Sequence, residues 1–236
     1  YFYAKKFNPK TKVINYSTGM HQFLQNVKTM QRVKDVYAKK GIWLINSARL
    51  TDKSWFRQIV LSDAVIALGN EAVRESFEPY YKKNIYLLNS PFYLVKNYSR
   101  ILDNKEPDAH NHFIWFGSSG MVHKGLDLCL EFFSQNKRLT LHVCGPVAAD
   151  KQFIKAFRKE LFETSNIILH GFVDIESEKF ERLLETSYFA IFPSCSEGGS
   201  PSLLTLIGNG GLVALLTPHC SITVPHALTI NGFSFN

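Results

Sequence analysis

The sequence predicts an α/β protein made of two Rossmann-like parallel-sheet domains, of which the N-terminal one is incomplete. Apolar runs of strand length alternate with amphipathic segments of helical period along the chain. The runs are continuously apolar, which is typical of strands that helices cover on both faces of a parallel sheet. Clusters of small residues follow three of these runs, at the strand ends where ligands bind in such sheets.

The first half contains strand and helix patterns in alternation. Residues 21–40 predict an amphipathic helix that ends at Gly41. Its expected apolar stripe consists of Phe23, Val27, Met30, Val33 and Val36 or Tyr37. Strands are expected over residues 12–16, 42–47, 61–70 and 84–92, and a short helix over residues 71–81.

Residues 97–111 have the composition of a linker, because they are polar, contain a proline and show no clear period. They divide the chain near Asp108 into two expected domains, residues 1–108 and residues 109–236. In the second domain, strands are expected over residues 112–116, 139–144, 166–173, 188–194 and 212–217. Helices are expected over residues 125–136, 151–163, 177–187 and 201–211, the third with Ser177 as its N-cap.

Composition places the chain among ordinary globular proteins. Of its 236 residues, 45% are hydrophobic and 20% are charged, and no apolar run is long enough to cross a bilayer. Four widely spaced cysteines without a CxxC pair indicate buried free thiols in a reducing compartment, and no zinc site is expected. We therefore expect a cytoplasmic protein.

Positive charge is concentrated in the first half of the chain. Residues 1–109 hold 18 Lys and Arg against 9 Asp and Glu, whereas the rest holds 9 against 11. Such asymmetry indicates an anionic partner, although a solvated basic surface has the same composition. Because the sequence lacks an aromatic-basic nucleic-acid motif and a zinc finger, we expect no nucleic acid. We expect instead that this half makes a peripheral contact with a membrane.

The loop after the apolar run at 188–193 holds a single acid, Glu197, followed by Gly198, Gly199, Ser200 and Pro201. Ser200 suits an N-cap and Pro201 the first helical position, so the positive end of a helix should lie beside the glycines. Such an end binds phosphate, which the glycines allow to approach closely. Glu197 would accept hydrogen bonds from sugar hydroxyls, unless the loop is only a tight turn with a solvated acid.

A second loop, FGSSGMVHKG, ends with Lys124 at the start of a predicted helix. A lysine at this place neutralises a diphosphate, although a plain surface lysine fits the same pattern. The sequence lacks both a GxxxxGK[ST] phosphate loop and a GxGxxG fingerprint at the strand ends, which argues against a nicotinamide or flavin enzyme. It also lacks a clear Asp-x-Asp motif, so no metal is expected.

Four segments together resemble the donor half of retaining GT-B glycosyltransferases of the GT4 type. They are FIWFGSSGMVHKGLDLCLEFF, LHVCGP, IILHGFV and FAIFPSCSEGGSPSLLTLIGNGG, in the family's order, within residues 113–217. The first half resembles the later part of the acceptor-side domain, much less specifically. The resemblance implies transfer of a sugar from a nucleotide-diphosphate sugar, with retention, to a glycan, lipid or small-molecule acceptor, without a cofactor.

The resemblance also implies roles for individual residues. Lys124 and Glu197 would be the catalytic pair, with the lysine on the donor phosphates and the acid on the sugar hydroxyls. The other donor-binding positions would be Gly117 and Ser118 beside the phosphates, Gly171, Phe172 and Val173 around the base, and Gly198, Gly199 and Ser200 under the sugar and diphosphate.

Two departures from the pattern favour an alternative, a non-catalytic GT-B protein that binds nucleotide sugar or glycan. Thr205 stands where the second acid of the E-x7-E motif, usually a ribose ligand, is expected. Its hydroxyl can still hydrogen-bond a ribose, without charge. The chain is also short for the family. For a catalytic base, His21 and His123 are candidates only because they lie near loops.

Overall fold

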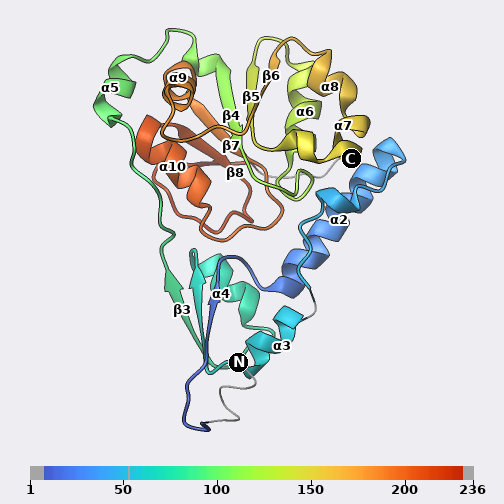
Figure 1. Cartoon of the computed structure of the whole chain (residues 1–236), viewed down its shortest axis with the longest axis vertical. Helices are drawn as coiled ribbons and strands as arrows, with labels where there is room; N and C mark the ends of the chain where they lie inside the picture. The colour runs from blue at the N-terminus through green and yellow to red at the C-terminus, as the bar shows by residue number, and fades with distance from the viewer. Residues whose placement is uncertain (1–7, 53, 231–236) are drawn as a thin grey trace.

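The computed structural model describes residues 8–52 and 54–230 and contains two parallel sheets (Figure 1). One has three strands in the order β1-β2-β3, namely β1 (Ile14–Ser17), β2 (Ala64–Leu68) and β3 (Asn84–Leu88). The other has six strands in the order β6-β5-β4-β7-β8-β9. The predicted α/β class with two parallel sheets, the first of them small, is confirmed.

Within the described residues, helices cover one face of the three-stranded sheet and leave the other face open. Its buried face packs Val65 and Ile85 against Ile59 of α3 (Ser54–Leu61) and Phe77 of α4 (Glu71–Phe77). On the other face, large apolar side chains are half exposed: Ile14, Tyr16, Tyr86 and Leu88. Helix α3 has no counterpart among the predicted elements.

The six-stranded sheet has the strand order of dinucleotide-binding folds, with the order reversing between β4 and β7. Its strands are β4 (His112–Phe116), β5 (Thr140–Cys144), β6 (Ile167–Gly171), β7 (Phe189–Phe192), β8 (Val213–Leu216) and β9 (Leu228–Thr229). Every pairing in it is parallel. The strand β9 lies beyond the last strand that the sequence predicts.

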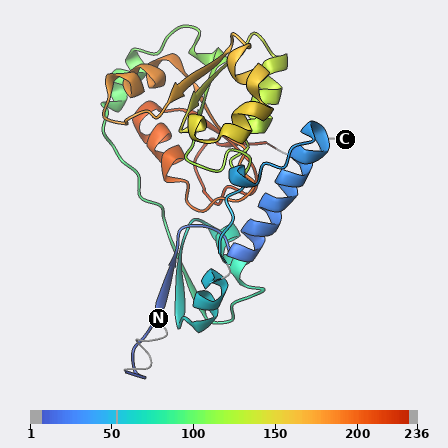
Figure 2. The ribbon, with the colours of Figure 1, turned by 45° about the vertical axis from the view of Figure 1, so that its right-hand side comes forward.

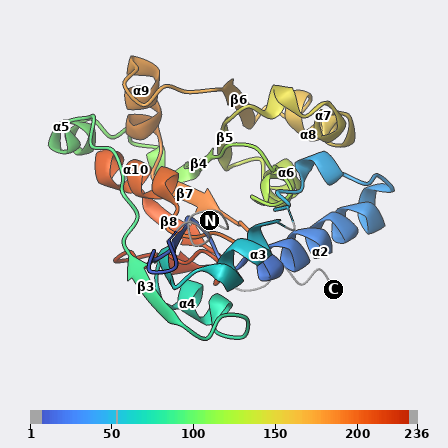
Figure 3. The same cartoon turned by 60° about the horizontal axis from the view of Figure 1, so that its bottom comes forward.

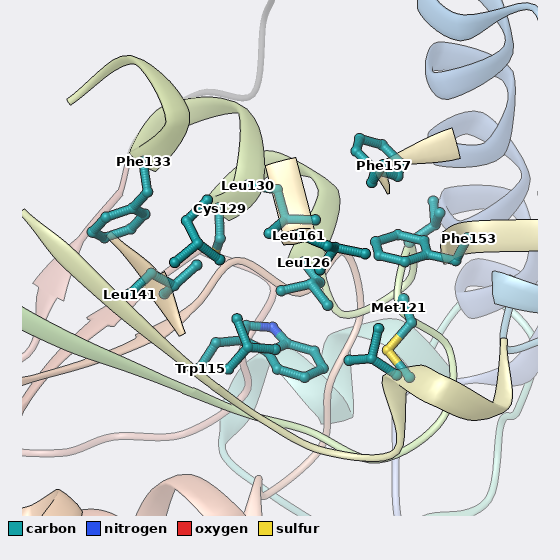
Figure 4. Packing of buried hydrophobic residues seen from close by; sticks show 14 of the residues in the cluster. Trp115, Met121, Leu126, Cys129, Leu130, Phe133, Leu141, Phe153, Phe157 and Leu161 are labelled. Carbon is teal, nitrogen blue, oxygen red and sulfur yellow. The ribbon is translucent and has the colours of Figure 1, made fainter. Parts of the chain in front are cut away.

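Helices cover both faces of this sheet, as the continuously apolar strands predict. One core lies under α6 (Leu126–Gln135), α7 (Lys151–Ala156) and α8 (Arg158–Phe162). Figure 4 shows Trp115 at the base of this core, beneath Leu126 and beside Met121. The opposite core lies under α9 (Glu178–Thr186) and α10 (Pro201–Gly210) and includes Leu203 and Leu206. The predicted N-cap of α9 is confirmed, because the Ser177 hydroxyl accepts from the Phe180 N–H.

Two predicted segments differ from the structure in the second half. The expected helix over residues 151–163 is divided into α7 and α8, because Phe157 takes a non-helical conformation while its ring is buried in the core. The expected linker over residues 97–111 contains α5 (Tyr98–Asp103), which Asn97 caps, and the 3-10 turn η2 (Ala109–Asn111). Ile101 of α5 is buried in the core under α9 and α10, so this segment packs on the second sheet.

Helix α2 (Gln22–Lys40) ends at Gly41 in the left-handed conformation, as predicted. The predicted apolar stripe is only partly correct. We call the three-stranded sheet with α2, α3 and α4 the first unit, and the six-stranded sheet with the helices that cover it the second unit. Val33 and Val36 are buried in the core of the second unit, whereas Phe23, Val27, Met30 and Tyr37 remain between 38% and 51% exposed. The reason is that α2 turns a polar strip, including Thr29 and Arg32, toward the second unit.

The predicted strand over residues 42–47 is wrong. The structure has an irregular segment there that ends in the 3-10 turn η1 (Ile45–Ser47). Leu44 is buried in the core shared with α6, while Trp43 stacks on Tyr37 with ring centroids 4.3 Å apart. Ile42 also packs against this core, whereas Trp43 and Ile45 are 47% and 44% exposed, so the apolar run is not a strand buried on both faces.

Helix α2 and the segment after β3 join the two units. Figures 1, 2 and 3 show α2 leaving the three-stranded sheet and running along the second unit beside α6 and α7. Arg32 Nη2 lies 2.5 Å from Asp127 Oδ2 of α6, and both side chains are almost fully buried. On the other side, the backbone N–H groups of Val95 and Lys96 each donate to Asn209 Oδ1 at 2.8 Å. The units therefore hold a defined relative position.

Candidate functional site

A cavity of about 760 Å³ lies where the carboxyl ends of the two sheets face each other. The second unit lines it with the ends of β4, β5 and β6 and with the loop after β7. The first unit lines it with the ends of β1 and β2. Because the strand order of the second sheet reverses between β4 and β7, the cavity opens at the place where this kind of sheet binds ligands.

The loop after β4 carries Lys124 and is fixed from below by the core. The indole N–H of Trp115 donates to the Lys124 carbonyl at 3.1 Å, and the Lys124 N–H donates to Gly120 O at 2.8 Å. Gly117 lies directly on the Trp115 ring, where a Cβ atom would come within 2.3 Å of it. A glycine is therefore required for the loop to turn over the indole.

The loop after β7 carries Glu197 and is held from both sides. The Glu197 N–H donates to His219 O at 2.9 Å, and its carbonyl accepts from the Ser221 N–H at 3.3 Å. The Cys195 N–H donates to His123 O at 3.0 Å, which ties this loop to the Lys124 loop. The two predicted site loops are thus joined through their backbones.

Lys124 and Glu197 form an ion pair through Nζ and Oε1 inside the cavity. Their side chains are only 9% and 12% exposed. Burial by itself acts to raise the pKa of Glu197, but the charge of Lys124, with smaller effects from His123 and Arg49, outweighs burial and lowers it. The acid is therefore ionised at neutral pH.

Ser200 precedes helix α10 at the predicted position, and Pro201 begins the helix. The prediction that the Ser200 side chain caps the helix is wrong, because Ser200 has φ 42° and makes no capping hydrogen bond. Its hydroxyl and that of Ser196 are buried without a hydrogen-bond partner in the described part of the chain. Both residues line the cavity, although the two hydroxyl oxygens themselves are buried.

The two glycines after Glu197 are packed against the first unit. A Cβ atom on Gly198 would stand 2.4 Å from the Thr18 carbonyl oxygen, and one on Gly199 would stand 2.3 Å from Ser90 Cβ. These glycines therefore allow the close approach of the two units. Gly198 also lines the cavity, whereas Gly199 does not.

The remaining predicted positions divide into two groups. Ser118, Phe172 and Val173 line the cavity together with Gly117, and the Phe172 ring is 81% exposed at its rim. Gly171 and Thr205 lie outside the lining. The Thr205 hydroxyl donates to Pro201 O at 2.8 Å within α10 and accepts from the Tyr93 N–H at 3.5 Å.

The two histidine candidates have different environments. His21 lies outside the cavity lining, caps α2 and stacks on Tyr80 with ring centroids 4.5 Å apart. His123 lines the cavity, and its Nδ1 lies 2.7 Å from the Thr29 hydroxyl oxygen. Burial lowers the pKa of His123 to about 4, so its imidazole is neutral at pH 7.

Sequence reasoning missed the side of the cavity that the first unit supplies. This side includes Gln22, Gln25, Arg49, Thr51 and Trp55. Arg49 and Thr51 follow the apolar run at 42–47, which was predicted to be a strand, so they could have been named as residues at a strand end. Because the run is not a strand, this prediction would have rested on a wrong element.

In the described residues, no group of three or more His, Cys, Asp or Glu side chains is arranged to hold a metal ion. None of the described helices is both long and apolar enough to span a membrane.

Comparison with known proteins finds similar structures but no similar sequences. No family model matches the sequence, and no curated protein matches it. The structure is similar to sucrose-phosphate synthase from Thermosynechococcus elongatus, with a TM-score of 0.60 at 12% identity over 93% of this chain and 54% of that one. It is also similar to Anabaena HepE in complex with UDP and glucose, with a TM-score of 0.54 at 11% identity over 94% and 60%. The third is a glycosyltransferase from Rickettsia africae, with a TM-score of 0.52 at 14% identity over 92% of this chain and 54% of that one.

The chain thus spans between 54% and 60% of the length of these three proteins. Each match extends over more than nine tenths of this chain, so both sheets and the cleft between them are included. At such low identity the likeness establishes the architecture. The described residues therefore have a GT-B-like fold in part, with a three-stranded sheet in the first unit and a six-stranded sheet in the second.

Proposed function

We propose that the chain binds a nucleotide-diphosphate sugar in the cavity between the two sheets and transfers the sugar, with retention, to an acceptor. The observation that carries this proposal is the placement of Lys124 and Glu197. They follow the two strands on either side of the reversal in strand order, and they meet inside one cavity. A cation and an acid at this place suit a ligand with an anionic diphosphate at one end and hydroxyls at the other.

The site would act mainly by stabilising the charge of the leaving diphosphate. The N-terminus of α10 directs its positive dipole end toward the cavity at Ser200 and Ser202. Lys124 adds a full positive charge beside it. Fixed positive groups of this kind stabilise the negative charge that grows on a leaving group. The HepE structure, which holds UDP and glucose, is a protein of the same fold with this class of ligand.

Glu197 would hold the sugar. Its Oε1 is bound to Lys124, and its Oε2 makes no hydrogen bond with the described residues. A carboxylate oxygen accepts hydrogen bonds from hydroxyls more strongly than a neutral acceptor does. Ser196 and Ser200 belong to the same wall, and their hydroxyls are buried without a partner among the described residues. The base would lie against Phe172 and Val173, at the end of β6.

The alternative is a protein that binds a nucleotide sugar without transferring it. One observation favours this alternative: the Thr205 hydroxyl, which stands at the expected ribose position, is already bonded within α10 and to Tyr93. Release of free nucleoside diphosphate from the bound donor in the presence of acceptor mixtures separates the two functions. The acceptor class, whether glycan, lipid or small molecule, and a membrane contact through the basic first half stay predictions.

The proposal is tested by calorimetric titration with UDP-, GDP- and ADP-sugars and with the bare nucleotides. We expect one nucleotide series to bind, and Lys124→Ala to weaken it by about tenfold or more, as for loss of a charged hydrogen bond. Lys137→Ala, at an exposed lysine of the same unit, is the matched control and should leave affinity unchanged. Failure of every nucleotide sugar and nucleotide to bind would refute the proposal.

A further inference from the structure

The charged residues of the cavity leave one positive charge without a partner. Arg49, Lys124 and Glu197 are the Lys, Arg, Asp or Glu residues among the described residues that line it. Lys124 and Glu197 neutralise each other in their ion pair. His123 is neutral because burial lowers its pKa to about 4. The net positive charge of the cavity is therefore the charge of Arg49.

The backbone that carries Arg49 is anchored to the Lys124 loop. The His123 N–H donates to Ser47 O at 3.3 Å, and the Ser47 hydroxyl donates to the carboxylate of Asp150. Arg49 itself lies against Gly120, so closely that a Cβ atom on this glycine would stand 3.0 Å from Arg49 Cβ. A residue of the first unit is thus placed beside the glycine loop of the second unit.

The Arg49 side chain is available to a ligand. In the described ranges 8–52 and 54–230, no ion pair or hydrogen bond of its guanidinium is present, and the residue is exposed. Its backbone carbonyl accepts a hydrogen bond from the Gln25 side-chain amide at 2.8 Å. A free guanidinium is planar, always charged and able to bind two phosphate oxygens at once.

We propose that Arg49 binds the diphosphate of the donor, as a second cation supplied across the cleft by the first unit. This inference rests on the proposed function and assigns the diphosphate two cations with different duties. Lys124 is shared with Glu197 and therefore links the phosphates to the sugar side of the site. Arg49 is not paired with an acid among the described residues, and it lies beside Gly120 in the loop that carries Lys124. The ligand then bridges both units, so its binding draws them together.

The test compares Arg49→Gln and Arg49→Lys with Arg57→Gln, an exposed arginine of α3 outside the cavity lining. The probes are inorganic pyrophosphate and the UDP/UMP, GDP/GMP and ADP/AMP pairs, titrated calorimetrically at two salt concentrations. We expect Arg49→Gln to weaken the binding of pyrophosphate, and of the nucleoside diphosphate that wild type binds, by about tenfold or more. The binding of the corresponding monophosphate should weaken clearly less. Arg49→Lys should recover part of the loss, and Arg57→Gln should bind as wild type.

Equal affinity of wild type and Arg49→Gln for pyrophosphate and for the bound diphosphate would overturn the inference while leaving the proposed function intact. If pyrophosphate binds with the expected Arg49 dependence but no nucleotide binds, the anion site stands and the nucleotide-sugar function fails. If wild type binds neither pyrophosphate nor any nucleotide, both fail. Thermal melting of each variant checks that the fold is unchanged. We expect no change, because the Arg49 guanidinium makes no ion pair or hydrogen bond within the described ranges.

Discussion

Lys124 and Glu197 lie 73 positions apart in the chain and form an ion pair inside the cavity between the two sheets. Each follows a strand that flanks the reversal in strand order, so the topology of the sheet brings them together. The pair is nearly buried and shares the cavity with the unpaired charge of Arg49. Its two members are therefore coupled, and neither can be changed without affecting the other.

Replacing Glu197 by alanine should separate sugar recognition from nucleotide binding. The variant loses the carboxylate that would hold the sugar hydroxyls. A hydrogen bond to a charged group contributes about 1.5–3 kcal/mol, so the binding of the preferred sugar should weaken by about this amount. Lys124 is released to the phosphates, so affinity for the bare nucleoside diphosphate should rise. Competition titrations with nucleotide sugars that differ only in the sugar measure both effects. Unchanged preference among these sugars would contradict the role given to Glu197.

The stability effects of Lys124→Met and Glu197→Gln should not add. Each single change leaves one buried charge without its partner, whereas the double change removes both charges. A double-mutant cycle by urea unfolding should therefore give a coupling energy of about 0.5–3 kcal/mol. Strict additivity would mean that the ion pair does not form in solution.

The contact between α2 and the second unit depends on the buried pair Arg32–Asp127. Arg32→Met should lower the free energy of unfolding by about 3–5 kcal/mol, because it leaves the Asp127 carboxylate buried and unpaired. Arg32→Met combined with Asp127→Leu should restore most of this loss. The control is Arg182→Met, whose ion pair with Glu106 is exposed and should contribute less than about 1 kcal/mol. Similar losses for Arg32→Met and Arg182→Met would contradict the assignment.

Gly198→Ala should force the two units apart at the edge of the cavity. The added Cβ would meet the Thr18 carbonyl oxygen at 2.4 Å, and backbone atoms cannot rotate away as a side chain can. We expect a destabilisation of about 1–3 kcal/mol, typical of overpacking. Gly19→Ala is the matched control, since its Cβ would meet only Gln25 Oε1 at an ordinary 3.6 Å. Urea midpoints of the two variants should differ clearly.

Stability should decrease as the pH falls below about 6.5. Burial lowers the pKa of His21 and His123 to about 4 and that of His142 to about 3, so the unfolded chain binds these protons first. Burial raises the pKa of Asp127 to about 6 despite Arg32, and this acid acts in the opposite direction below pH 6. Burial also lowers the pKa of His170 and His219, which adds to the effect of the other histidines. The net slope between pH 6 and 5 should therefore be at least two protons, or about 1.4 kcal/mol per pH unit for each.

His142→Gln gives this pH dependence a specific check. His142 lies between His112 and His170 on adjacent strands, 2.9 Å from a ring nitrogen of each. Removing it should reduce the slope of unfolding free energy against pH by about one proton, whereas His226→Asn at an exposed position should not. Urea unfolding from pH 5 to 7.5 measures the slope. A slope in His142→Gln equal to that of wild type would contradict the prediction.

The strands β4 to β8 of the second sheet were predictable because each is a mainly apolar run in a sheet that helices cover on both faces. The strand β9 was not predictable, because it has two residues and both are exposed. The meeting of Lys124 and Glu197 was predictable for a related reason, since parallel strands bring their carboxyl ends to one edge. The exposed part of the α2 stripe and the run at 42–47 were not predictable. Val33 and Leu44 are buried by contact with the other unit, and local periodicity carries no record of a partner that lies far away in the chain.

The same limit applies to the site. Arg49 reaches the cavity only because its loop is anchored at Ser47 to the second unit. The glycines after Glu197 were expected to make room for phosphate, and their Cβ positions are filled instead by Thr18 and Ser90. Such features depend on how two units approach each other, which no short stretch of sequence specifies.

The half-exposed apolar face of the three-stranded sheet affects how this protein must be assayed. Ile14, Tyr16, Tyr86 and Leu88 form a row of apolar and aromatic surface in the folded chain. Dyes such as ANS fluoresce on contact with surfaces of this kind, which are usually a sign of a loosened core. In this protein the native state itself should bind the dye, so melting curves need a probe that is independent of it, such as circular dichroism.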